Sequence, residues 1–271
     1  MQETIKYDST ILSDHEPQFF TTQKFGTILT WNILYKCDLI VRENHRYYNN
    51  GFAYIEGEEE YIARLERITQ KIYDFITEKH DLSILALQEL PLNLNHMVFF
   101  NETLNNYMHK IEAKVFNACL NYFDVVSDNM IICDANRLYV ESNATLKKSF
   151  QNIVKNQASR GQFYTFTNSH NEKLDFINIH LKWYEPYSYN YDENIKNLLS
   201  FIDNYKQNNV EGRDLIITGD FNFDLNALEY PDIEIHAAIN TTVVYVNDQG
   251  TQELQTNDGF IYLNNPGKII K

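Results

Sequence analysis

The chain has few of the residues that mark several large classes of protein. Its three cysteines, Cys37, Cys119 and Cys133, form no metal-binding spacing and cannot all pair with one another. We therefore expect a reducing, cytoplasmic compartment. No apolar run is long enough to cross a membrane, and no basic stretch followed by an apolar block marks a secretory signal.

Positive charge is also scarce, because 23 lysines and arginines face 37 aspartates and glutamates, for a formal net charge of -14. Binding to long duplex nucleic acid depends on Lys and Arg side chains that neutralise phosphates. We therefore expect no strong binding to duplex DNA, although a local basic groove could still exist. The excess of carboxylates fits either a cation site or a surface that keeps the protein in solution. The sequence leaves the oligomeric state open.

Glycine and proline are also few, at nine and five in 271 residues, and no linker or internal repeat interrupts the chain. We therefore expect a single domain spanning residues 1–271. Helical periodicity is present in Tyr61–Ile76 and Asp192–Lys206, and more weakly in Leu104–Phe123. The residue types at Asn247–Gly250 predict a turn. Short strand-like runs cover Gly26–Leu34, Ser83–Gln88, Met130–Cys133, Gln162–Thr167, Leu174–Ile179, Leu215–Thr218, Thr241–Val246 and Gly259–Leu263. This order predicts two sheets with helices outside them.

Several of these strands end or begin with a polar residue that an ordinary core strand would not place there. Each such residue alone is typical of a turn, a cap or a hydrogen-bonded structural position. Together they form a set with the chemistry of a phosphoester-cleaving site. The set is Asn32, Glu89, His180, Asp220, Asn222 and Asp258.

The residue types divide into three chemical roles. Mg²⁺ prefers oxygen ligands, which Glu89 and Asn32 can supply, and Mn²⁺ suits the same donors. His180 and Asn222 can donate hydrogen bonds to phosphoryl oxygens, and Asp220 can orient an attacking water. A second histidine that stabilises the developing charge is the one component this set lacks.

Four short motifs, WNIL at 31–34, LQEL at 87–90, NIHL at 178–181 and GDFN at 219–222, carry a family resemblance. In order and spacing they resemble the endonuclease/exonuclease/phosphatase (deoxyribonuclease I-like) superfamily. The resemblance covers nearly the whole chain, and a helix bearing Arg67 upstream of Glu89 also fits it. It implies a metal-dependent phosphoric ester hydrolase with a four-layer α/β sandwich fold, in which helices flank two packed, mainly antiparallel sheets.

Members of this superfamily carry a Ser-Asp-His motif, often followed by proline, after the aspartate that Asp258 resembles. The sequence holds this motif at the opposite end, as Ser13, Asp14, His15 and Pro17. We therefore expect a circularly permuted arrangement in which His15 completes the site. By resemblance, Asp258 would orient His15, and Asp14 would lie near the metal or brace the site.

The segment from His180 to Pro186, with Trp183 inside it, is similar to that of nocturnin-type deadenylases. The resemblance implies a Mg²⁺-dependent phosphodiester hydrolase, such as a 3′-exonuclease, that acts on single-stranded RNA or small nucleotides. A phosphatase acting on nucleotide, inositol or lipid phosphates stays open as an alternative. A catalytically silent binding module is a further one, although the filled polar positions argue against it. An asparagine-rich chain of this kind could also be an effector delivered to a host cell.

Overall fold

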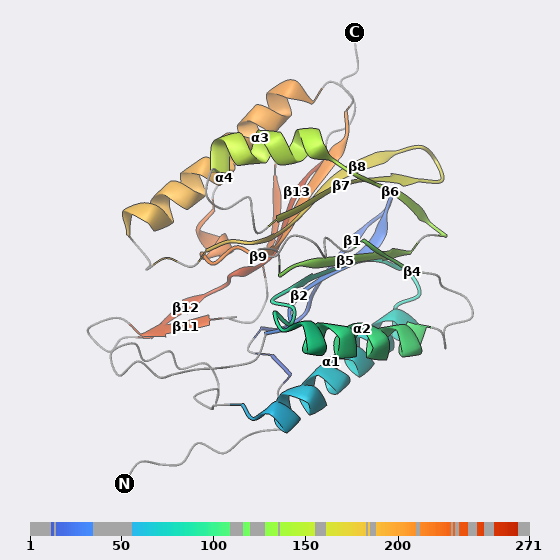
Figure 1. The fold of residues 1–271 in the computed structure, drawn as a ribbon. Coiled ribbons are helices and arrows are strands. Elements are labelled where there is room, and N and C mark those ends of the chain that lie inside the picture. Colours follow the sequence, from blue (N-terminus) through green and yellow to red (C-terminus); the bar gives the residue numbers. More distant parts are fainter. Residues whose placement is uncertain are drawn as a thin grey trace.

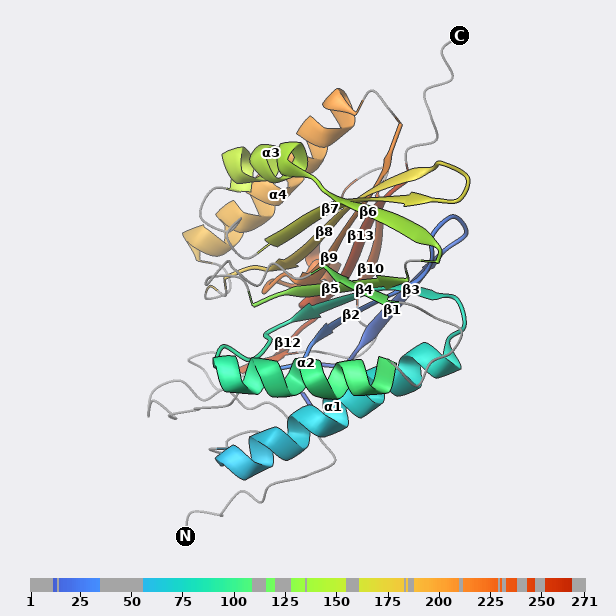
Figure 2. The ribbon, with the colours of Figure 1, turned by 45° about the vertical axis from the view of Figure 1, so that its right-hand side comes forward.

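The structure is a computed structural model. It describes residues 12–13, 15–34, 56–108, 116–119, 128–134, 136–154, 161–182, 184, 188–209, 212–228, 230, 233–237, 243–246 and 252–264. Two sheets face each other, and each carries a pair of helices on its outer side (Figure 1). A 45° rotation of the view shows the same four layers (Figure 2).

The first sheet has five strands in the order β1-β2-β3-β5-β4. Only β2 and β3 are parallel in it, because the chain returns through helix α1 between them, and the other pairs are antiparallel. The strands are β1 (Gln18–Thr22), β2 (Gly26–Asn32), β3 (Leu82–Gln88), β4 (Phe116–Cys119) and β5 (Met130–Asp134). Helices α1 (Glu58–Glu78) and α2 (Leu94–Met108) cover its outer face.

The second sheet has six strands in the order β10-β13-β9-β8-β7-β6. Again one pair is parallel, β8 with β9, and helix α4 lies between them in the chain. The strands are β6 (Leu138–Ser142), β7 (Gly161–Asn168), β8 (Lys173–His180), β9 (Asp214–Asp220), β10 (Glu234–Ala237) and β13 (Asp258–Leu263). Helices α3 (Ala144–Val154) and α4 (Tyr189–Asn208) cover the outer face of this sheet.

Two smaller elements complete the described part of the chain. A two-stranded antiparallel sheet joins β11 (Val243–Val246) to β12 (Gln252–Gln255). A single 3₁₀ turn, η2 (Leu225–Ala227), follows the end of β9.

The central strands are buried on both faces, which explains why their sequences are continuous runs of apolar residues. In β2, Ile28 packs between the two sheets, whereas Leu29 packs against α1 and α2. In β8, Phe176 packs between the sheets and Ile177 packs beneath α3 and α4. Because successive side chains of a strand point to opposite faces, alternate residues of these strands fill two different core layers.

The fold predicted from the resemblance, an α/β sandwich of two mainly antiparallel sheets flanked by helices, is confirmed. One predicted element is wrong in part: helix α2 ends at Met108, and Phe116–Cys119 form strand β4 instead of continuing a helix to Phe123. A short apolar run fits either period, and here pairing with β5 decides for the strand. The turn predicted at Asn247–Gly250 lies outside the described residues. No helix in the described part of the chain is long and apolar enough to cross a membrane.

Candidate active site

Five strand ends bring polar side chains to one rim of the two sheets. Parallel strands end at the same edge of a sheet, so the ends of β2 and β3 lie together, as do those of β8 and β9. Strand β13 runs antiparallel to β9 and begins where β9 ends, with Asp258 paired to Asp220. The rim therefore gathers Asn32, Glu89, His180, Asp220 and Asp258.

Asn32 joins the two sheets across this rim. Its amide nitrogen donates to Glu89 Oε1 and to Asp220 Oδ2, each at 3.0 Å. Its amide oxygen accepts from the Leu34 backbone N–H at 3.0 Å, which fixes the orientation of the amide group. In this arrangement the Asn32 amide nitrogen donates to both carboxylates, and the role of its oxygen as a metal ligand stays a prediction.

His180 forms a dyad with Asp128, the residue two positions before β5. The distance from His180 Nδ1 to Asp128 Oδ2 is 2.9 Å, and Nε2 lies 3.4 Å from Glu89 Oε1. Burial opposes protonation of His180, but the Asp128 hydrogen bond and the charges of Asp220, Glu89 and Asp128 outweigh it and raise its pKa to about 9. His180 is therefore a cationic donor at neutral pH.

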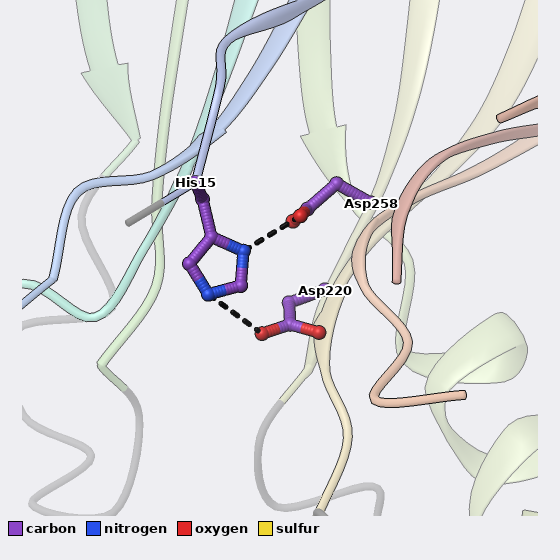
Figure 3. A group of neighbouring side chains, drawn as sticks. All are labelled: His15, Asp220 and Asp258. Atoms are coloured by element: carbon purple, nitrogen blue, oxygen red, sulfur yellow. Dashed lines mark hydrogen bonds and ion pairs between the residues drawn. The ribbon is translucent and has the colours of Figure 1, made fainter. Parts of the chain in front are cut away.

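His15 forms the second dyad, with Asp258. Its Nδ1 lies 2.6 Å from Asp258 Oδ2, and both side chains are buried (Figure 3). The segment that carries His15 is held by two further bonds: Trp31 Nε1 donates to the His15 carbonyl at 2.9 Å, and Ser13 Oγ donates to the Asn32 carbonyl at 2.7 Å. The residue expected to complete the site thus lies in it.

Asp220 lies between the two dyads. Its Oδ2 is 3.9 Å from Nε2 of His15 and 3.9 Å from Nε2 of His180. Burial and the neighbouring Asp258 charge raise the pKa of Asp220, while the two histidines and the Asn222 backbone N–H act in the opposite direction. Two imidazoles therefore converge on one buried carboxylate, an arrangement suited to moving a proton.

At three positions of the site the backbone has a positive φ, a conformation that few residues other than glycine adopt. Glu89 and Asn222 have φ values of 55° and 52°, in the left-handed region that is uncommon outside glycine. Gly219, one residue before Asp220, has a φ of 128°, and a Cβ there would lie 1.9 Å from the Ile179 carbonyl oxygen. Glycine in the GDFN motif therefore allows β8 and β9 to approach each other beside His180 and Asp220.

The other residues singled out in the sequence have mixed outcomes. Asn222 supports Asp220 through its backbone N–H at 2.8 Å, and its side-chain amide nitrogen donates to the Leu181 carbonyl at 2.7 Å. Asp14 and Trp183 lie outside the described residues. In α1 the fully buried arginine is Arg64, one turn before Arg67.

Sequence reasoning missed Asp128, which orients His180. The sequence carries a signal for it, because Asp128 lies two residues before the apolar run Met130–Cys133, at the start of that strand and not at its end. Strand β5 is antiparallel to β3, so its start lies beside the end of β3. An antiparallel neighbour can therefore contribute a site residue from its start.

Two groups of side chains among the described residues have the composition of a metal site. One is Glu89, His180 and Asp220, and the other is His15, Asp220 and Asp258. The possible ligand atoms of each group lie within 4.8 Å of one another. Clustered carboxylates repel one another, so a divalent cation at this rim would relieve that repulsion. The residues present therefore fit a divalent cation.

Two facing mixed sheets between helix pairs, with a polar site at one rim of the strands, define the endonuclease/exonuclease/phosphatase fold. Two solved structures have a similar fold. An endonuclease/exonuclease/phosphatase family protein from Bacteroides thetaiotaomicron is 12% identical, with a TM-score of 0.51 over 93% of this chain and 85% of that one. The human nocturnin catalytic domain is 15% identical, with a TM-score of 0.50 over 91% of this chain and 85% of that one. No protein-family model and no curated protein sequence matches the chain.

Proposed function

We propose that this protein is a metal-dependent phosphoester hydrolase and that its active site is the rim around Asp220. The observation that carries the proposal is the convergence of two His-Asp dyads and Glu89 on one buried carboxylate, from strand ends in both sheets. A structural role for one such histidine would be ordinary. Here the histidines of two dyads both face the Asp220 carboxylate, and two site residues have left-handed backbone conformations. These features together favour a catalytic role over a structural one.

Glu89 is the proposed principal ligand of the cation. Its side chain is 13% exposed, the most accessible of the rim carboxylates for which an ion pair is found, so it can be reached from solvent. Mg²⁺ in phosphoryl-transfer sites is held by one or two protein carboxylates, and substrate oxygens and water complete its shell. When bound, the ion would polarise a phosphoryl oxygen and offset its negative charge. Asn32 keeps Glu89 and Asp220 in place through its two donated bonds.

The chain's own residues supply the proton chemistry in this proposal. Asp220 orients the attacking water and accepts its proton, because its raised pKa brings it closer to the working pH. Protonated His180 donates from Nε2 to a phosphoryl oxygen, since Nδ1 is engaged by Asp128. His15, whose Nδ1 is engaged by Asp258, gives the proton on its Nε2 to the leaving oxygen as the bond from phosphorus to that oxygen breaks. Positioning and electrostatics would supply most of the rate enhancement.

As substrate we propose a phosphodiester in a single-stranded or small nucleotide. The formal charge of -14 disfavours long duplexes, and the segment after His180 resembles that of nocturnin-type deadenylases. The test is a turnover screen with Mg²⁺ over poly(A), single-stranded DNA, cyclic and dinucleotides, and inositol and lipid phosphates. Faster release of phosphate from monoesters than cleavage of any diester would replace this substrate class with the phosphatase alternative.

The hydrolase itself is tested by Glu89→Ala and His15→Ala, each of which should abolish Mg²⁺-stimulated turnover. Glu102→Ala on the exposed side of α2 and His170→Ala in the turn between β7 and β8 are matched controls that should keep it. Full activity in His15→Ala would remove His15 from the mechanism. Absence of turnover of any phosphoester by the unmodified protein would leave the silent binding module as the better description.

We also propose that the chain order is circularly permuted. Strand β1 directly follows the Ser13–Pro17 segment and pairs antiparallel with β2, from Gln18 opposite Thr30 to Thr22 opposite Gly26. His15, which precedes this hairpin, contacts Asp258 of the other sheet. These two contacts support the proposal that Ser13–Pro17 takes the place of the segment that in the superfamily follows the Asp258-like strand.

A further inference from the structure

Arg64 of helix α1 is a fully buried charged side chain for which the proposed reaction gives no role. It is buried where α1 packs against the residues that follow β2, and its exposed fraction is 0%. A buried guanidinium costs several kcal/mol unless its donors are satisfied. Arg64 meets this condition through Glu56, since its Nε and Nη2 reach the two carboxylate oxygens at 2.7 and 2.8 Å. This bidentate ion pair leaves Nη1 for other partners.

Among the described residues, Nη1 donates to three backbone carbonyls from two separate segments. It donates to Leu12 at 3.0 Å, to Ile33 at 3.0 Å and to Leu34 at 2.8 Å. Leu12 lies three residues before His15, and Ile33 and Leu34 directly follow Asn32. One guanidinium therefore ties together the segment that delivers His15 and the segment that orients Asn32.

Two routes of hydrogen bonds lead from Arg64 to the site. In the first route, Arg64 binds the carbonyl of Leu34. The Leu34 N–H in turn fixes the Asn32 amide. That amide donates to Glu89 and Asp220. In the second, Arg64 holds Leu12, and the adjacent Ser13 is bonded through Oγ to the Asn32 carbonyl and to the His15 N–H. Leu34 has a φ of 56°, so this junction adopts a backbone conformation that needs outside support.

We propose that Arg64, charge-balanced by Glu56, is a positioning residue that docks the Leu12–His15 segment onto β2 and thereby places His15 and Asn32 for catalysis. The expected effect on turnover rests on the proposed function, whereas the placement of His15 and Asn32 by Arg64 does not. Arginine is required because a lysine ammonium cannot contact a carboxylate with two donors and three carbonyls at the same time.

The decisive variant is the double substitution Glu56→Leu with Arg64→Met, which removes both charges together. Replacing a buried ion pair by apolar residues of similar volume is often neutral for stability, so we expect the variant to fold. We expect kcat to fall about 10- to 100-fold while KM stays near that of the unmodified protein, because misplacement of catalytic groups acts on turnover. Arg213→Met, which breaks the ion pair with Asp175 near the start of β8, is the matched control and should change neither.

A second measurement separates positioning from stability. The 2.6 Å hydrogen bond between His15 and Asp258 should give a far-downfield proton resonance in NMR spectra of the unmodified protein and of Arg213→Met. We expect the double variant to lose or broaden this resonance although its melting temperature is retained. A folded double variant with an unchanged resonance would overturn the proposal, whatever its turnover.

This readout also distinguishes the two proposals. If the unmodified protein hydrolyses no phosphoester, the proposed function fails, and the resonance still decides whether Arg64 positions His15. If the double variant does not fold, Arg64→Lys takes its place, with the same loss of the resonance expected. An intact resonance in folded Arg64→Lys would equally reject the role of the guanidinium.

Discussion

Single residues at the rim act through their partners more than through their own position. His180 and His15 each use Nδ1 to bind an aspartate and turn Nε2 toward Asp220. The partner orients the ring, and the Asp128 carboxylate at Nδ1 of His180 also stabilises the imidazolium form and raises the pKa. Substitution of the aspartates therefore tests the histidines while leaving their rings in place.

Asp128→Asn is the first such test. The amide keeps a hydrogen-bonding partner for His180 but removes a negative charge, so the His180 pKa should fall from about 9 toward its ordinary value of 6.5. We expect turnover to drop by about 10²-fold, with the alkaline limb of the pH–rate profile displaced to lower pH. Both proteins are measured at the same saturating Mg²⁺, so the ion's own effect on the pKa is common to them.

The matched control for Asp128→Asn is Asp134→Asn. Asp134 is equally buried but lies at the opposite end of β5, where it binds the Asn136 N–H and contacts Arg137. It should leave the pH–rate profile unchanged. An alkaline limb that stays in place in Asp128→Asn would contradict the dyad's proposed role.

His180 should also make the stability of the metal-free protein depend on pH. Its folded pKa of about 9 lies above the unfolded value, so protonated His180 contributes stability that is fully present below about pH 6.5 and is lost as pH rises through about 9. The contribution is on the order of 3 kcal/mol. Urea unfolding at a series of pH values in a chelator should show this slope, and His180→Gln should lack it. Parallel curves for the two proteins would contradict the raised pKa.

At the scale of elements, the close approach of β8 and β9 places His180 beside Asp220. Gly219→Ala would add a Cβ 1.9 Å from the Ile179 carbonyl oxygen at a φ of 128°. We expect the free energy of unfolding to fall by about 4 kcal/mol or more, since neither backbone can move without breaking the parallel pairing. Thermal unfolding measures the effect. Gly57→Ala at the start of α1, where φ is -68°, is the control and should cost far less.

The elements also show which features the sequence could predict. Strands buried on both faces, such as β3 and β9, are continuous apolar runs and were located within a residue or two. The edge strands β6 and β10 were missed because half-exposed side chains interrupt their apolar pattern. The end of α2 could not be read from periodicity, because only pairing with β5 makes Phe116–Cys119 a strand.

The site was predictable to the extent that its residues lie at strand ends. Asn32, Glu89, His180 and Asp220 follow apolar runs, and a shared edge then brings them together. The amide orientation of Asn32 was not predictable, because it depends on the Leu34 N–H. Arg64 and Arg67 are one helical turn apart, and only the packing of α1 on β2 shows that Arg64 carries the buried contacts.

At the scale of the whole molecule, the proposed permutation predicts that chain order is separable from the site. The hairpin between β1 and β2 turns at Gln23 and Lys24, which are both exposed. A break before Gln23 keeps Lys24 joined to β2, so its ion pair with Asp214 can still form. A rearranged gene would begin at Gln23 and place residues 1–22 after residue 271. The number of residues between Asp258 and His15 is then ample to span one sheet.

We expect the rearranged protein to fold, to show the downfield His15 resonance and to keep turnover within about 10-fold of the original, since breaking a surface hairpin mainly costs loop-closure entropy. The control carries the same rearrangement with His15→Ala and should be inactive but folded. If the rearranged chain folds and still lacks both the resonance and activity, the short hairpin itself is needed to place His15. The two chain orders would then not be equivalent, and the resemblance of Ser13–Pro17 to the superfamily motif would need another explanation.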